Sequence, residues 1–157
     1  MTRPFTYDRQ TDEVRSVIEI SALFAQRNNH EVKEVVHFLA AVFAESNIGK
    51  TLLHDCSSFS DDCSQDEISA TLSTVIPPTK NWVQRPVASN ELLDVLDDGA
   101  RLANTYGVER ISVEHVLEGI LDSPNEMDVA FLRAMMLDIE CSLKKVKQVN
   151  HETSRQD

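Results

Sequence analysis

The sequence predicts an all-α domain of eight helices, arranged as two pseudo-symmetric sets of four. Apolar residues recur at three- and four-residue steps, and only four Gly and five Pro interrupt the 157 residues, a pattern that favours long helices. The chain also repeats itself: VEHVLEGIL at 113–121 echoes VVHFLAAVF at 35–43, with His37 and His115 78 positions apart. The same offset places Thr11 on Ser89. One motif is therefore used twice, at about 10–76 and 89–149, within a single domain.

In the first repeat, Thr11 is the predicted N-cap of a helix that extends to about Arg27, because its hydroxyl can accept from an early helical N–H. The polar segment 28–31 reads as a turn. A nearly uniformly apolar helix follows at about 35–44 and is expected to be central and buried. A short helix from 46 and another at 66–76 complete this half, and Pro77 and Pro78 end it.

The second repeat follows the same scheme after an irregular connection at 77–88, where Trp82 is expected to anchor the linker to the core. Ser89 caps a helix, Gly107 opens the next turn, and 113–121 forms the central helix. A helix begins at 123–126, with core residues from 127 to 136, and a last helix covers about 140–149. The tail 150–157 is expected to fray. In the helix that Ser89 caps, the residues predicted to face inward are Leu92, Leu93, Leu96, Ala100 and Ala103.

Composition narrows the function classes. The chain has 15 basic and 26 acidic residues, a net charge of −11, which argues against nucleic acid as a partner. No segment approaches the roughly 18 apolar residues that cross a bilayer, so no membrane partner and a cytoplasmic location are expected. The three cysteines, Cys56, Cys63 and Cys141, are odd in number and form no C-x-x-C pair, so reduced thiols are expected rather than a disulfide framework.

Two apparent motifs are set aside. Gly49-Lys50-Thr51 resembles the end of a phosphate-binding loop, but Ala44 stands where that loop needs its first Gly, and the preceding segment reads as a helix. A helix start that happens to contain these residues is the better interpretation. The polar loop with His54, Cys56, Asp61, Asp62 and Cys63 lacks the ligand spacing of a structural zinc site. No metal or cofactor site is predicted.

His37 and His115 recur by symmetry, which invites a catalytic interpretation. Each lies inside an apolar helix with no Ser or Cys nucleophile in a recognisable partner motif. A structural His that hydrogen-bonds a neighbouring turn is the preferred interpretation, and no catalytic residue is predicted.

The repeated pattern, a capped helix, a short turn, then E-H-h-L and an apolar helix, resembles the Clp N-terminal repeat. It is carried by ALFAQRNNHEVKEVVHFLAAVF and SNELLDVLDDGARLANTYGVERISVEHVLEGIL, and it covers about residues 5–149 in two copies. In that family the double repeat is a compact all-α domain at the N-terminus of AAA+ unfoldases such as ClpA, ClpB and ClpC. It receives substrates or adaptor proteins, so the resemblance implies a protein partner. These 157 residues contain no ATPase motif, so the chain reads as a separate Clp N-type protein or as a domain of a longer one.

The resemblance also implies site residues. In ClpC-type relatives, an N-cap hydroxyl and the Glu of the E-H motif bind phosphorylated arginine. The second copy offers Ser89 and Glu114, and a hydroxyl at a helix N-terminus suits phosphate while a carboxylate suits guanidinium. In the first copy Thr11 remains, but Val36 replaces the Glu, so that pocket is expected to be degenerate. Ordinary capping and first-turn charge explain the same residue types.

Three functions remain open. The leading hypothesis is a non-catalytic module that binds substrate polypeptides or adaptor proteins of a Clp system. The second is a stand-alone accessory that docks on a Clp ATPase or protease core. The third, an enzyme that uses His115 and Glu114, has no positive support in the sequence.

Overall fold

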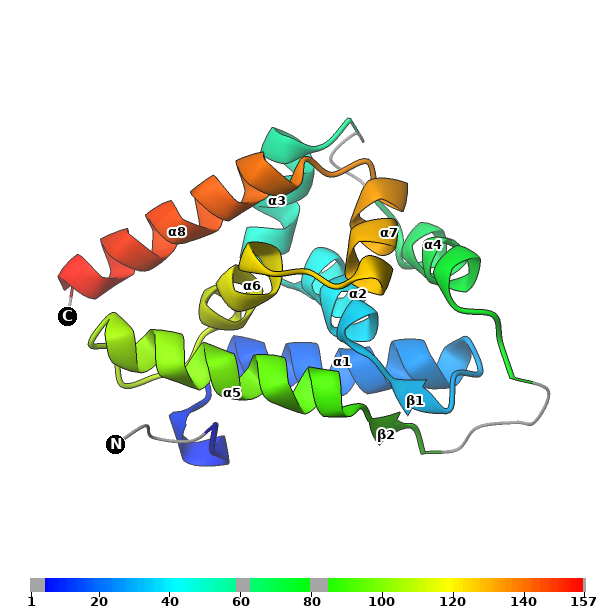
Figure 1. The fold of residues 1–157 in the computed structure, drawn as a ribbon, viewed down its shortest axis with the longest axis horizontal. Coiled ribbons are helices and arrows are strands. Elements are labelled where there is room, and N and C mark those ends of the chain that lie inside the picture. The colour runs from blue at the N-terminus through cyan, green and yellow to red at the C-terminus, as the bar shows by residue number, and fades with distance from the viewer. Residues whose placement is uncertain (1–4, 59–62, 80–84, 157) are drawn as a thin grey trace.

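A computed structural model describes residues 5–58, 63–79 and 85–156 and shows a chain folded almost wholly into helices (Figure 1). Two short parallel strands and one 3-10 turn (Tyr7–Arg9) accompany the helices. Within the described ranges the predicted eight helices are present. In chain order the elements are α1 (Asp12–Arg27), β1 (Val32–Lys33), α2 (Val35–Glu45), α3 (Asn47–Cys56), α4 (Gln65–Val75), β2 (Val87–Ala88), α5 (Asn90–Thr105), α6 (Val113–Asp122), α7 (Glu126–Ala134) and α8 (Ile139–Gln156).

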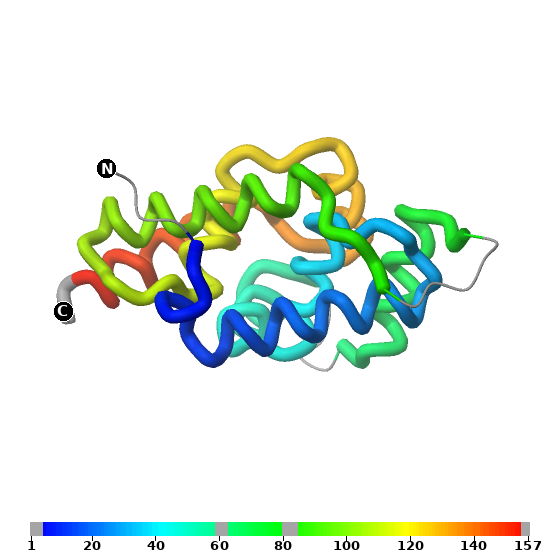
Figure 2. The backbone as a smooth tube through the Cα atoms, turned by 90° about the horizontal axis from the view of Figure 1, so that it is seen from below, coloured from blue at the N-terminus to red at the C-terminus, as the bar shows by residue number. Residues whose placement is uncertain are grey.

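The two repeats start alike. α1 and α5 each have 16 residues. After each of them the chain turns back, so that α1 packs on α2 and α5 packs on α6. Both turns use a left-handed residue, Asn29 with φ 57° and Gly107 with φ 73°, which Asn and Gly tolerate best. The prediction of turns at these two places is confirmed. α1 and α5 run in opposite directions along one side of the molecule (Figures 1 and 2).

Short backbone contacts tie each repeat to the other at both ends of these long helices. At one end β1 and β2 pair in parallel, with Val32 opposite Val87. At the other end Gln10 and Ile111 form an isolated parallel bridge. In both cases the turn that follows one long helix pairs with the segment that precedes the other. The start of each repeat therefore lies against the middle of its partner repeat.

The core is built around α2, as predicted. Its residues Val35 to Phe43 are all buried, and the helix contacts α1, α3, α4, α5 and α7. Gly49 explains the Gly-Lys-Thr segment: it lies in α3, and a β-carbon there would overlap the carbonyl of Val42 in α2. The segment is thus a helix start in which glycine permits close packing, and the interpretation of Gly49-Lys50-Thr51 as part of a helix start is confirmed.

Two positions predicted to face inward are exposed instead. Leu93 is 49% exposed although its neighbour Leu92 is buried. The buried face of α5 includes Leu92, and the next residue, Leu93, points to the side of that face. Met136 is 54% exposed and takes a left-handed φ of 57° in the turn after α7. Met135, one residue earlier, is the one that fills the core.

The prediction of a frayed tail at 150–157 is wrong. α8 continues to Gln156, and Asn150 is only 1% exposed. Its side-chain amide donates to the carbonyl of Glu114 at 3.1 Å and to the carboxylate of Glu118 at 3.0 Å. These bonds to α6 hold the last turns of α8 in place, and a polar tail gave no sign of them in the sequence.

The prediction of three reduced thiols is also wrong, because Cys56 and Cys141 form a disulfide with their Cα atoms 5.6 Å apart. The two cysteines are 85 positions apart in the chain, and only the tertiary fold brings the end of α3 to the start of α8. Cys63 is a free thiol.

Trp82, which was expected to anchor the linker, lies outside the described residues. In the part of the chain that the structure describes, no helix has the length and apolar character to cross a bilayer.

Candidate functional site

Thr11 is the N-cap of α1, and it lies beside the turn that leads into α6. Its hydroxyl oxygen accepts from the N–H of Val14 at 3.2 Å, as predicted. Its own backbone N–H donates to the carbonyl of Ile111 at 3.1 Å. Ile111 is three residues before Glu114, which lies in the first turn of α6. The structure therefore places the hydroxyl of one repeat next to the E-H segment of the other.

Ser89 occupies the equivalent place at the opposite end of the molecule. Its hydroxyl accepts from the N–H of Leu92 at 3.0 Å, which confirms the predicted N-cap. Its backbone N–H donates to the carbonyl of Lys33 at 3.0 Å, just before α2. The E-H position there is Val36, which is fully buried in the core. This end has a capping hydroxyl without the carboxylate at that position.

The structure does not bring Ser89 and Glu114 together. Ser89 caps the start of α5, whereas Glu114 follows the turn after its end, and the 16 residues of α5 span about 24 Å. The pairs that share an end are Thr11 with Glu114 and Ser89 with Val36. Pairing within one repeat was the natural assumption from sequence, and the crosswise backbone contacts overturn it.

A pocket of about 490 Å³ opens at the Thr11 end, and we call it the Thr11 pocket. Arg110 on its wall is exposed and supplies a cation, and the N-terminal end of α1 adds the positive end of a helix dipole. Asp12 and Glu13 in that turn are engaged elsewhere, with Arg15 and with the backbone of Asn47. The residues that line the pocket are Thr11, Gly107, Val108, Glu109, Arg110, Ser112, His115 and Thr153.

The pocket lies where the second repeat lacks a side chain that the first repeat has. In the first repeat His37 Nδ1 accepts from the N–H of Glu34 at 2.8 Å, and its Nε2 lies 2.8 Å from Nδ1 of His30. His30 Nε2 lies 3.0 Å from the carbonyl of Ile76. One arrangement of protons satisfies this chain: both rings are neutral, each accepts at Nδ1, and each donates at Nε2.

His115 is bonded on only one side. Its Nδ1 accepts from the N–H of Ser112 at 3.0 Å, as His37 does from Glu34, but position 108, equivalent to His30, is a valine. Nε2 of His115 is buried and has no hydrogen-bond partner. Burial lowers the pKa of His115 to about 4. The interpretation of both histidines as structural residues that bond a neighbouring turn is confirmed, and the second one is less completely satisfied.

A buried acid next to the pocket was missed in the sequence analysis. Glu118 is 6% exposed although it belongs to the apolar helix α6. One carboxylate oxygen accepts from the hydroxyl of Tyr106 at 2.7 Å and from the amide of Asn150 at 3.0 Å. Burial, together with the hydrogen bond to Glu118 and its negative charge, raises the pKa of Tyr106 well above its usual range, so Tyr106 stays a hydrogen-bond donor near pH 7. The sequence feature that could have indicated this buried acid is the position of Glu118 between Leu117 and Gly119, within a largely apolar helix.

His115, the residue of the rival enzyme hypothesis, is held as a buried neutral ring. His115 is 1% exposed, its Nδ1 bonds its own helix cap, and its lowered pKa keeps it neutral near pH 7. Among the described residues no three His, Cys, Asp or Glu side chains gather in a way that could hold a metal ion.

Comparison with known proteins agrees with this fold. The model of the Clp repeat (R) N-terminal domain matches residues 9–150. A search of curated protein sequences found no match.

Several solved structures are similar, at sequence identities that establish the fold alone. The N-terminal domain of the chaperone ClpD from Arabidopsis thaliana matches with a TM-score of 0.73 and 14% identity, over 92% of this chain and 99% of that one. The Hsp104 N-terminal domain from Candida albicans matches with a TM-score of 0.66 and 13% identity, over 89% and 90%. The N-terminal domain of the ClpV1 ATPase from E. coli matches with a TM-score of 0.61 and 17% identity, over 91% and 86%. The double helical repeat and the family match together show that this chain belongs to the Clp repeat N-terminal domain family, the N-domains of Clp ATPases.

Proposed function

We propose that this chain is a non-catalytic module that binds substrate polypeptides or adaptor proteins of a Clp system, and that the Thr11 end is its binding site. Domains of this family bind proteins in Clp systems. The observation that carries the proposal is the Thr11 pocket, where a helix N-terminus with a capping hydroxyl meets the exposed Arg110. Its lining includes Ser112 and His115, which flank the half-buried Glu114 in the chain. At the Ser89 end the corresponding position is the buried Val36.

The chemistry of the Thr11 end suits a side chain that carries both signs of charge. The positive end of the α1 dipole and the guanidinium of Arg110 favour an anionic group such as phosphate. Glu114, whose backbone is fixed by Asn150, favours a guanidinium beside that anion. A phosphorylated arginine on a polypeptide meets both requirements, and it is the ligand class we propose for this end.

The test is a titration of labelled peptides that differ only in phosphorylation of one arginine, followed by fluorescence anisotropy. The phosphorylated peptide should bind the wild-type chain, and Glu114→Gln should weaken binding about tenfold or more, the loss of one charge-assisted contact. Glu91→Gln is the matched control, because Glu91 also lies in the first turn of a helix, at the Ser89 end. Equal binding by wild type and Glu114→Gln would reject the site.

A further outcome separates binding of clients from docking. Mixing the chain with an assembled Clp ATPase ring and separating the mixture by size shows whether it associates without any peptide. Co-migration that Glu114→Gln leaves intact, with no peptide binding by either protein, would favour a docking accessory over a receptor.

A further inference from the structure

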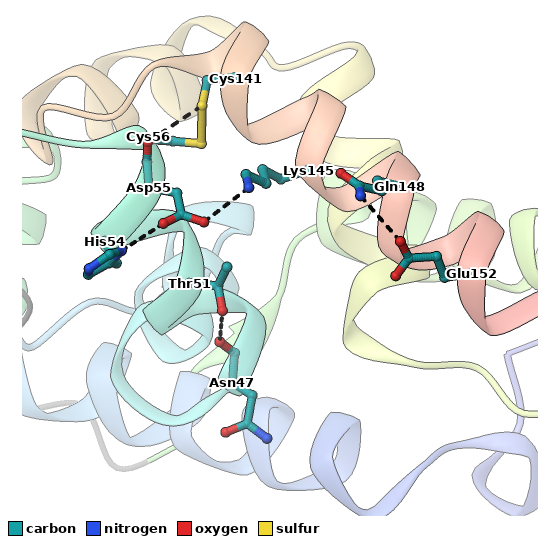
Figure 3. Close-up of polar contacts among 9 residues, drawn as sticks. All are labelled: Asn47, Thr51, His54, Asp55, Cys56, Cys141, Lys145, Gln148 and Glu152. Carbon is teal, nitrogen blue, oxygen red and sulfur yellow. Dashed lines mark hydrogen bonds and ion pairs between the residues drawn. A yellow bond between two sulfur atoms is a disulfide. The ribbon is translucent and has the colours of Figure 1, made fainter.

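A pair of cysteines at the end of α3 and the start of α8 has no part in the proposed binding function. Figure 3 shows Cys56, the last residue of α3, bonded to Cys141 in the first turn of α8. Cys56 is 5% exposed, whereas Cys141 is partly exposed and lines a pocket of about 500 Å³. A reagent in solvent therefore meets Cys141 first.

The two sulfurs stand at opposite ends of helix dipoles. Cys141 lies at the N-terminal, positive end of α8, which stabilises a thiolate. Cys56 lies at the C-terminal, negative end of α3, which does not. Around Cys141, Lys144 and Lys145 favour a thiolate, while Asp138 and Glu140 oppose it. Asp55, which pairs with Lys145, adds a third negative side chain near this site. The side-chain charges therefore do not favour Cys141, and the two features that do are its access to solvent and the helix dipole.

The backbone keeps the two cysteines together without the disulfide. The N–H of Asp138 donates to the carbonyl of Cys56 at 2.7 Å, and Ser57 and Leu137 form an isolated antiparallel bridge. An ion pair of 3.1 Å also joins Lys145 of α8 to Asp55 of α3 (Figure 3). Two reduced thiols would therefore stay within reach of each other, so the disulfide can open and close while the surrounding backbone contacts persist.

From these observations we propose that Cys56 and Cys141 form a reversible redox site, with Cys141 as the reactive sulfur, Cys56 as the resolving sulfur and a hydroperoxide as the oxidant. The Cys141 thiolate attacks the terminal oxygen of the hydroperoxide. The O–O bond breaks, the alkoxide leaves and takes up a proton as an alcohol, and Cys141 becomes a sulfenic acid. Cys56 then attacks the Cys141 sulfur, the S–O bond breaks, and water leaves. The two sulfurs together lose two electrons, which reduce the peroxide.

A dithiol reverses the reaction. One thiolate of the dithiol attacks the accessible Cys141 sulfur and displaces Cys56, which takes up a proton. The second thiol then displaces Cys141, leaving two reduced cysteines in the chain and one disulfide in the dithiol. Cys63 takes no part: it is a free thiol whose pKa is raised by burial and by Glu67, so it is the internal control.

The first experiment uses the wild-type chain, so it does not depend on a variant that folds. The protein is reduced, the reductant is removed, and circular dichroism confirms retained helix. Brief alkylation with a limiting reagent, read by peptide mass spectrometry, should label Cys141 several-fold faster than Cys63 or Cys56. Hydrogen peroxide should then restore the Cys56–Cys141 bond. Faster labelling of Cys63 than of Cys141, or no Cys56–Cys141 bond after peroxide, would overturn the proposal.

The second experiment assigns the two roles. With Cys56→Ser, peroxide should leave a sulfenic acid on Cys141 that a 1,3-diketone traps. With Cys141→Ser, the same treatment should leave Cys56 unmodified. Trapping to the same extent at Cys56 would contradict the assigned roles. Cys63→Ser is the matched control, and it should behave as the wild type in both steps.

Discussion

Acid should destabilise this fold through two buried imidazoles. His37 and His115 are 0% and 1% exposed. Burial lowers the pKa of His37 to about 3, with the neighbouring His30 as a second cause, and lowers that of His115 to about 4. The ordinary pKa of an unfolded histidine is near 6.5. Between these pH values the two imidazoles bind protons in the unfolded chain but not in the folded chain. The free energy of unfolding is therefore at its full value above pH 6.5 and falls as the pH drops below 6.5.

The magnitude follows from the two pKa differences. At pH 5 each histidine costs about 2 kcal/mol of the free energy of unfolding, or about 4 kcal/mol together. Asp128 acts in the opposite sense, because burial raises its pKa to about 6. Its proton is bound more tightly in the folded state, which restores about 1 kcal/mol of the free energy of unfolding at pH 5. The net loss between pH 7.5 and 5 is therefore about 2 to 3 kcal/mol, and the lowered pKa of His30 adds to it.

Denaturant unfolding at constant ionic strength, at several pH values from 7.5 to 5, measures this loss. His115→Gln should reduce the slope of stability against pH by about 1 kcal/mol per pH unit near pH 5.5, because about one fewer proton is taken up on unfolding. Asp128→Asn, which removes the group that acts in the opposite sense, should steepen the slope. Stability that stays level or rises between pH 7.5 and 5 would refute the reasoning.

Three other substitutions test the packing. Leu117→Ala, at a fully buried position of α6, should lower the free energy of unfolding by about 2–5 kcal/mol in denaturant titration, and a much smaller loss would mean that α6 is peripheral. Gly49→Ala should lower the thermal midpoint clearly, because its β-carbon has no room, whereas Gly119→Ala, where a β-carbon meets only ordinary contacts, should not. Val108→His should supply the partner that His115 lacks and so exceed Val108→Ala in stability by more than about 1 kcal/mol; equal stability would show that the imidazole finds no bond.

Most of the fold could be predicted because local signals and the repeat agree. Thr11 and Ser89 begin the two long helices through the predicted capping bonds, and Asn29 and Gly107 mark the turns with left-handed backbone. The uniform apolar character of α2 correctly predicted its burial. Each of these features depends on a few consecutive residues, and such features are readable from one sequence.

The features that the sequence did not reveal depend on contacts between distant segments. The pairing of Thr11 with the α6 turn depends on a bridge between positions 10 and 111. The Cys56–Cys141 bond depends on how α8 meets α3. Asn150 keeps the tail helical only because Glu118 and the carbonyl of Glu114 face it. A repeat shows which residues are equivalent, but it does not show which of them become neighbours.

The measurement that tests the proposed site most directly is a nuclear magnetic resonance titration of the isotope-labelled chain with the phosphoarginine peptide. Binding at the Thr11 end should shift the amide signals of Thr11 to Val14 and of Ser112 to Glu114, and should leave those of Ser89 to Leu92 in place. Shifts confined to the Ser89 end, or saturating binding with no shift at the start of α1 or α6, would contradict the account.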